Sequence, residues 1–105
     1  MKSPATFFVD NGMGMKDVGL INRGNSKYLN LPSNSYGIII IFGYTEAMSV
    51  YMCRALSTGD TEDKAILSST QIILTPERNK IKIANNSSGT IRILVVSNED
   101  FTLTA

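Results

Sequence analysis

The chain has 105 residues, 43% hydrophobic and 18% charged, which suits one globular domain with a single core and is too short for two. Ten Lys and Arg residues balance nine Asp and Glu residues, for a formal net charge of +1, so we expect no nucleic-acid partner and no membrane insertion. The sequence has no histidine, which removes the commonest general base and metal ligand and argues against an enzyme.

Two groups of side chains could carry chemistry, and neither forms a recognisable site. Cys53 is the only cysteine, so it has no partner for a disulfide within the chain and fits a small buried hydrophobic residue. Asp60, Glu62 and Asp63 offer the oxygen atoms that calcium prefers, but they lack the spacing of a calcium-binding loop. We therefore expect a solvated polar loop there, and neither a metal nor a cofactor.

Short segments rich in β-branched and aromatic residues recur along the chain, separated by glycine, asparagine and proline. In chain order, strands are expected at residues 6–9, 16–21, 27–31, 36–43, 48–55, 71–74, 80–83, 90–97 and 101–103. Residues 58–65 carry side chains typical of helix caps, so one helical turn and a polar loop are both open there. The pattern predicts a single all-β domain over residues 1–105: an antiparallel β-sandwich, jelly-roll-like, of eight or nine short strands.

The central strand is expected at 36–43, a run of four isoleucines and a phenylalanine bounded by glycines. The segment 48–55 follows after a short connection and predicts an antiparallel hairpin with it. In that hairpin Val50 and Met52 face one side of the sheet, and Tyr51 and Cys53 face the other.

A second hairpin is expected near the C-terminal end. Residues 80–83 alternate lysine and isoleucine, residues 85–89 form a turn rich in asparagine and serine, and residues 90–97 return. On the returning strand, Ile91, Ile93 and Val95 share one face and are expected in the core.

Several strands carry more apolar side chains than one buried face can take. We assign Ile38, Ile40 and Phe42 to the core, which leaves Ile39 and Ile41 pointing out of the sheet. On the segment 90–97, the surplus residues are Leu94 and Val96.

Something should cover this surplus set, because each such side chain contributes about 1.5–3 kcal/mol when it is fully buried. One possibility is a loop, or a strongly twisted sandwich whose inner strands are covered on both sides. The other is a symmetric contact between copies of the chain, with Ile39, Ile41, Leu94 and Val96 in the oligomer interface.

The segments 35–43 and 48–52, read as Ser-Tyr-Gly-Ile-Ile-Ile-Ile-Phe-Gly and Met-Ser-Val-Tyr-Met, resemble the distal receptor-binding head domains of bacteriophage tail-fibre proteins. The resemblance implies a β-sandwich that forms the head of a homotrimer on the virion, at the tail or fibre tip. It further implies attachment to a host-surface carbohydrate or protein. The alternative function is a purely structural module for oligomerisation or virion assembly, without ligand binding.

Saccharides are usually held against aromatic rings with amide and carboxylate groups around them. The candidate ligand-binding residues are Tyr44 and Glu46, in the connection between two expected strands, together with Tyr28 and Asn30. Tyrosines at strand ends also cap hydrophobic cores, so packing remains an alternative role for each of them.

Overall fold

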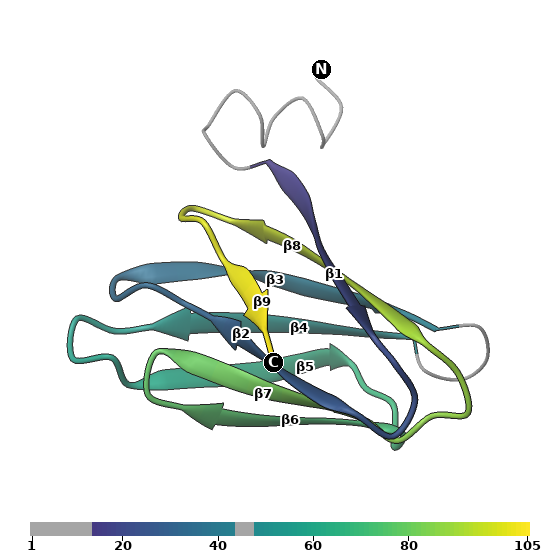
Figure 1. The fold of residues 1–105 in the computed structure, drawn as a ribbon. Helices are drawn as coiled ribbons and strands as arrows, with labels where there is room; N and C mark the ends of the chain where they lie inside the picture. Colours follow the sequence, from purple (N-terminus) through teal and green to yellow (C-terminus); the bar gives the residue numbers. More distant parts are fainter. Residues whose placement is uncertain (1–13, 44–47) are drawn as a thin grey trace.

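The structure is a computed structural model and describes residues 14–43 and 48–105. The strand expected at 6–9 and the connection 44–47 lie outside this range. In the described part of the chain no helix is long and apolar enough to cross a membrane. The strands (Figure 1) are β1 (Met15–Ile21), β2 (Ser26–Asn30), β3 (Ser35–Phe42), β4 (Ser49–Ala55), β5 (Thr61–Leu67), β6 (Ile72–Glu77), β7 (Lys80–Asn85), β8 (Ile91–Ser97) and β9 (Thr102–Thr104).

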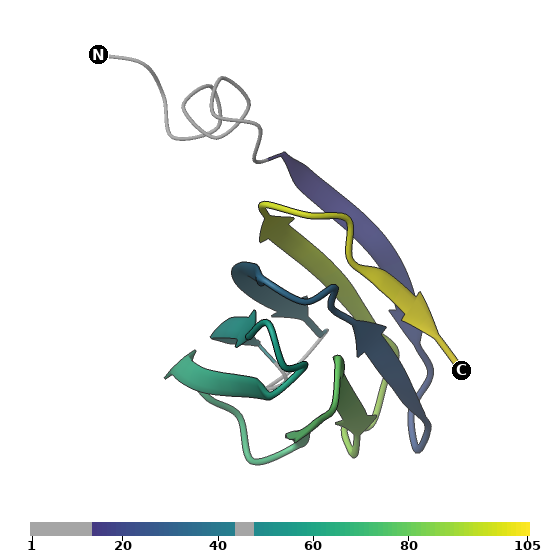
Figure 2. The same ribbon diagram turned by 90° about the vertical axis from the view of Figure 1, so that its left-hand side faces the viewer.

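These strands form two antiparallel sheets, as the sequence predicts. Sheet A has the order β1-β8-β3-β4-β5, and sheet B has the order β6-β7-β2-β9. Figure 2 shows the two sheets facing each other, with β1 beside β9 at one side and β5 beside β6 at the other. Since β1 pairs with β8 and β2 pairs with β7, the nesting of early and late strands resembles a jelly roll.

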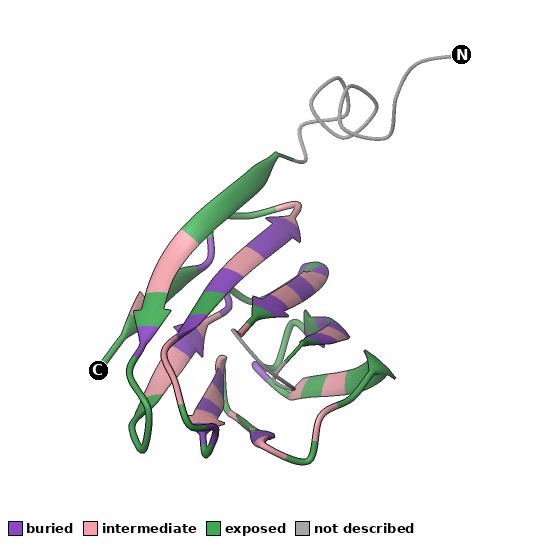
Figure 3. Cartoon of the chain, turned by 90° about the vertical axis from the view of Figure 1, so that its right-hand side faces the viewer, coloured by how far each residue is buried: buried purple, intermediate pink, exposed green. Residues whose placement is uncertain are grey.

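The core lies between the sheets and consists mainly of isoleucine side chains. Figure 3 shows the buried and exposed positions alternating along the central strands, as expected for sheets with one covered face. Phe101, just before β9, is fully buried. Among the described residues, the fully buried large apolar side chains are Ile21, Leu29, Leu31, Ile39, Ile41, Ile81, Ile83, Ile91, Ile93, Val95 and Phe101.

The face of β3 that enters the core is the opposite of the one predicted. Ile39 and Ile41 are buried in the core, whereas Ile38 and Ile40 are half-buried and Phe42 is exposed on the outer face. Both faces of this run are apolar, so its alternation carries no information on which face is covered. The prediction that Ile39 and Ile41 point outward is therefore wrong.

The register of β3 against β8 explains which face of β3 is buried. Ile39 lies opposite Val95, and Ile41 lies opposite Ile93. Directly opposed residues of an antiparallel pair share one face of the sheet, so the buried set on β8 places Ile39 and Ile41 in the core.

On β8 itself, the expected core residues Ile91, Ile93 and Val95 are confirmed, since all three are fully buried. Leu94 is half-buried on the outer face. Val96 is only 4% exposed, so this chain already covers it and the prediction that Val96 needs a partner is wrong.

The hairpin expected between 80–83 and 90–97 does not form. β7 pairs with β2 and β6, whereas β8 pairs with β1 and β3, so residues 86–90 carry the chain from sheet B to sheet A. Asn85 is fully buried at this crossing. Its Nδ2 donates hydrogen bonds to the carbonyl oxygens of Ile21 (2.9 Å) and Gly89 (2.8 Å), and its Oδ1 accepts from Ser87.

Residues 61–65 belong to β5, so neither the helical turn nor the polar loop expected over 58–65 extends across them. Thr61 lies opposite Ala55, and Asp63 lies opposite Cys53 on β4. The first four residues of this strand, 61–64, are polar, and most of the strand is exposed at the edge of sheet A. Charged residues are common on such edges because they discourage pairing with other chains, and this pattern conceals a strand from hydrophobic periodicity.

Candidate functional site

The outer face of sheet A is unusually apolar. In an antiparallel sandwich the outer face of each sheet is normally polar, yet here isoleucine, leucine, valine and methionine side chains cover it. Phe42 is 47% exposed, Met52 is 49% exposed and Leu20 is 41% exposed. We call this set the apolar face: Leu20, Ile38, Ile40, Phe42, Val50, Met52 and Leu94.

The outer face of sheet B has the ordinary polar character. Tyr28 lies opposite Lys82, and Asn30 lies opposite Lys80. The Lys80 ammonium sits 4.5 Å from the centre of the Tyr28 ring, a cation–π contact. Among the described residues, the exposed apolar surface therefore concentrates on the outer face of sheet A, whereas that of sheet B carries the exposed Ile73 among polar side chains.

Two of the four residues predicted to bind ligand lie on this polar face. The Asn30 side-chain nitrogen donates to the Thr102 carbonyl oxygen (3.1 Å) and to the Thr104 hydroxyl (3.0 Å), so it fastens β9 to β2. Tyr28 is half-buried under Lys80. The structure thus engages Tyr28 and Asn30 within sheet B, and Tyr44 and Glu46 lie outside the described residues.

A groove of about 520 Å³ crosses β3, β4 and β5 on the outer side of sheet A. Two rows of side chains bound it, and each row follows the strand register across the sheet. One row is Tyr36, Arg54 and Glu62; the other is Ile38, Met52 and Lys64. The backbone between the rows, at Gly37, Cys53 and Asp63, forms the floor.

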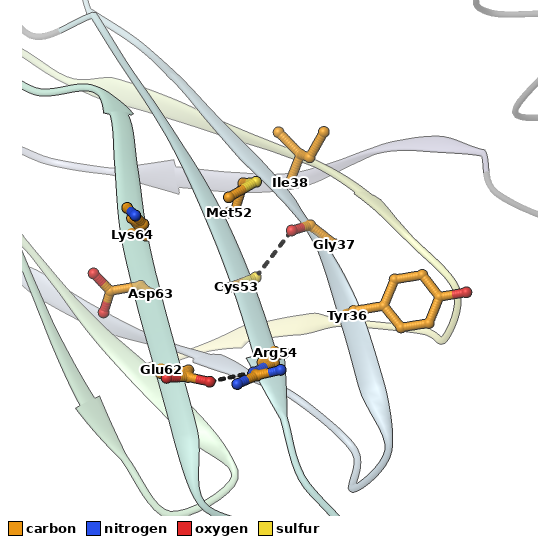
Figure 4. Close-up of a pocket in the computed structure, with 9 residues that line it drawn as sticks. All are labelled: Tyr36, Gly37, Ile38, Met52, Cys53, Arg54, Glu62, Asp63 and Lys64. Carbon is orange, nitrogen blue, oxygen red and sulfur yellow. Dashed lines mark hydrogen bonds and ion pairs between the residues drawn. The ribbon is translucent and has the colours of Figure 1, made fainter.

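The spacing of the rows sets the size of the groove. Residues two apart on a strand are separated by about 7 Å, and three neighbouring strands span about 10 Å. Figure 4 shows Tyr36 at the β3 end, pointing away from β4, and the side chains of Arg54 and Glu62 reaching toward each other. Such a groove accommodates a small, flat ligand rather than a helix.

The groove combines apolar and charged groups. Arg54 and Glu62 form an ion pair on exposed side chains, which places the guanidinium and the carboxylate beside each other. Tyr36 is 54% exposed, and Ile38 and Met52 provide an apolar wall. An apolar wall beside paired donors and acceptors is what a ligand with both apolar and hydroxyl-bearing surfaces needs.

Beneath the floor, Cys53 and Asp63 face the inside of the sandwich. The Cys53 thiol donates a hydrogen bond to the Gly37 carbonyl oxygen at 3.6 Å. Burial raises the pKa of this thiol to about 12, and the Asp63 carboxylate adds to the increase. Burial also raises the pKa of Asp63, whose Oδ2 atom is buried without a hydrogen-bond partner.

The three carboxylates considered for calcium point in different directions. Glu62 pairs with Arg54 on the outer side, Asp63 faces inward, and Asp60 accepts a hydrogen bond from the Thr58 hydroxyl at 2.9 Å. Among the described residues, no group of three histidine, cysteine, aspartate or glutamate side chains could hold a metal ion.

A second hollow of about 500 Å³ lies at the far end of the same outer face. Leu20, Phe42, Thr90 and Arg92 line it together with Gly43. Arg92 forms an ion pair with Asp17 of β1, so its charge is already balanced there. This hollow continues the apolar face toward β1.

The sequence interpretation did not find the groove residues Tyr36, Arg54, Glu62 and Lys64 as a set. The β3–β4 hairpin was expected, and it alone brings Tyr36 opposite Arg54. Glu62 and Lys64 could not be added, because β5 was not recognised as a strand. Residues 62–64 are all charged and show no alternation, so the available signal was the turn that contains Gly59 immediately before them.

Comparison of the chain with protein-family models, with curated proteins and with solved structures found no match.

Proposed function

We propose that this domain is a non-enzymatic binding module that holds a saccharide in the groove across β3, β4 and β5. The observation that carries the proposal is an apolar wall, Ile38 and Met52, beside the ion pair of the opposite row. A pyranose has one face of C–H groups and a rim of hydroxyls. The first packs on the apolar wall, and the second bonds to charged groups such as Arg54 and Glu62.

The likeness of residues 35–52 to tail-fibre heads supports a wider role in attachment to a host surface. In that role the saccharide belongs to a host-surface glycan, and the domain is the tip of a viral fibre. The argument against an enzyme rests on the sequence, which has no histidine, and on Cys53. With a pKa of about 12, its thiol is protonated at neutral pH and cannot serve as a nucleophile.

The test is binding of the purified domain to an array of neutral and acidic cell-surface oligosaccharides. We expect retention on at least one member, and a loss of about tenfold or more in affinity for Arg54→Ala, which corresponds to ~1.4 kcal/mol. Lys82→Ala is the matched control, because it removes a cation from the outer face of sheet B. No retention on any member, or equal losses for both variants, would refute the proposal.

A purely structural role is the second candidate function, and the apolar face is the specific observation that favours it. A module of this kind would assemble normally and bind no saccharide. The array therefore separates the two functions, and the mass measurement described below addresses assembly by itself.

A further inference from the structure

The apolar face approaches the size of a weak interface. It extends over β1, β8, β3 and β4, which at the usual strand spacing is about 20 Å wide, and its longest row, Ile38 to Phe42, covers about 15 Å along β3. Two such faces in contact bury somewhat less than about 1,000 Å², near the lower limit for a specific protein interface. Ile40 and Leu94, which lie opposite each other in the register, mark its centre.

Two ion pairs within the chain offset most of the charge on the outer side of sheet A. Asp17 pairs with Arg92, which lies within the face between Leu20 and Phe42, and Glu62 pairs with Arg54 at the β5 side. Lys64 stands outside these pairs, opposite Met52. An identical face can approach around an axis near Ile40 with little surplus of like charge, since neither ion pair presents a net charge and the two copies of Lys64 lie at opposite ends of the contact. An anionic membrane finds no basic cluster there, which favours a protein occupant.

The sheet edges favour contact through the faces rather than through added strands. β6 contains Pro76, which donates no backbone hydrogen bond, and β9 has three residues. β1 is bent by a bulge between Asp17 and Gly19, and β5 carries Glu62, Asp63 and Lys64. Each of these features discourages edge-to-edge pairing.

We infer that a second copy of this chain packs face to face on the apolar face of sheet A, around a twofold axis near Ile40 and Leu94. When a self-complementary face packs on the same face of a second copy, the two chains form a closed dimer. The interface residues of β3 lie on its outer face, opposite to the face that carries Ile39 and Ile41. Because the buried area is at the lower limit, the dimer dissociates on dilution.

The groove lies beside this interface at the β5 side, and the two share Ile38 and Met52 at their boundary. The inference does not depend on saccharide binding, since dimerisation is carried by Ile40, Leu94 and Phe42. A domain that dimerises and binds no saccharide would contradict the proposed function alone.

The experiment is light scattering behind a sizing column over a range of concentrations up to hundreds of micromolar. The parent protein should reach the mass of two chains and fall toward one on dilution. Ile40→Lys and Phe42→Lys should remain monomeric at every concentration, with circular dichroism showing that each is folded. Phe42→Lys should disturb the fold less than Ile40→Lys, because nearly half of the Phe42 surface is exposed.

Ile73→Lys is the matched control. Ile73 is 50% exposed on β6 and faces away from the core, so this variant adds the same charge to the outer side of sheet B and should dimerise like the parent. A parent that stays monomeric would overturn the inference and leave the face to a different protein. A mass of three chains would overturn the twofold arrangement, and equal dissociation by Ile73→Lys would overturn the choice of face.

Discussion

Asn79 and Asn85 stand at the two ends of β7, and each joins the loops at one end of the sandwich. The Asn79 side-chain nitrogen donates to the carbonyl oxygen of Leu31 (3.0 Å) and to the hydroxyl of Ser33 (3.2 Å), while its backbone N–H bonds to the carbonyl oxygen of Gly59 (2.9 Å). At the opposite end, where residues 86–90 pass from sheet B to sheet A, the Asn85 side-chain nitrogen donates to the carbonyl oxygens of Ile21 and Gly89. The two residues therefore fix how the strands of one sheet connect to those of the other.

Replacing Asn85 by alanine should destabilise the fold strongly. The change removes the donor to the carbonyl oxygen of Ile21 and the acceptor of the Ser87 backbone N–H, both in a buried place, which costs roughly 2–4 kcal/mol of unfolding free energy. Urea denaturation measures the loss. Asn86→Ala is the control, because Asn86 is exposed and should change stability by less than about 0.5 kcal/mol. Similar losses for the two variants would contradict the role given to Asn85.

Gly37→Ala should also destabilise the domain. A Cβ at this position would lie 2.5 Å from the carbonyl oxygen of Val96 and 2.8 Å from the Cβ of Ser97, so β3 and β8 would have to separate. Overpacking of this kind costs about 1–3 kcal/mol. Gly89→Ala has nothing within 4 Å of its new Cβ and should melt near the parent temperature. A Gly37→Ala protein as stable as the parent would show that the two strands have room to move.

The Cys53 thiol should react slowly in the folded protein. With a pKa of about 12, its thiolate fraction at pH 8 is on the order of a thousandfold below that of a free cysteine. Labelling with a disulfide reagent should therefore be slow in buffer and fast in urea. Asp63→Asn removes a negative charge that raises the Cys53 pKa, so this variant should react faster than the parent. A slower reaction would contradict the electrostatic contact.

Asp63 should make stability depend on pH in a defined direction. Its folded pKa is raised above the unfolded value, so the folded state binds the proton more tightly. The stabilisation is fully present below the unfolded pKa and is lost as pH rises through the folded pKa. Asp63→Asn should therefore melt at a higher temperature than the parent at pH 7, and the gain should shrink near pH 3. A gain that is the same at both pH values would rule out titration of Asp63 as its cause.

The fold class was predictable because it depends on features that are local in the sequence. Strand-forming residues with turn residues between them predict an all-β sandwich, and the β3–β4 hairpin follows from two apolar runs with a short connection. The buried face of β8 was also predictable, since Ile91, Ile93 and Val95 alternate with Arg92. A polar residue within the alternation shows which face meets water.

The pairing of strands was not predictable in the same way. β7 and β8 are adjacent in sequence with a turn between them, yet Asn85 turns the chain across to the other sheet instead of back along the same one. On β3, no polar residue interrupts residues 38–42, so the buried face depends on its partners. The groove combines residues from three strands. Predicting it would have required both the pairing of those strands and the knowledge of which face of β3 is exposed.

The position of β8 between β1 and β3 has a consequence for synthesis on the ribosome. Sheet A stays split into two parts until residue 97 has emerged, because β8 is the neighbour with which β1 pairs among the strands of residues 14–43 and 48–105. Contacts between segments so distant along the chain close slowly. Nascent chains therefore carry β1 without β8 through most of translation, and their protection from aggregation depends on the cell rather than on the finished fold.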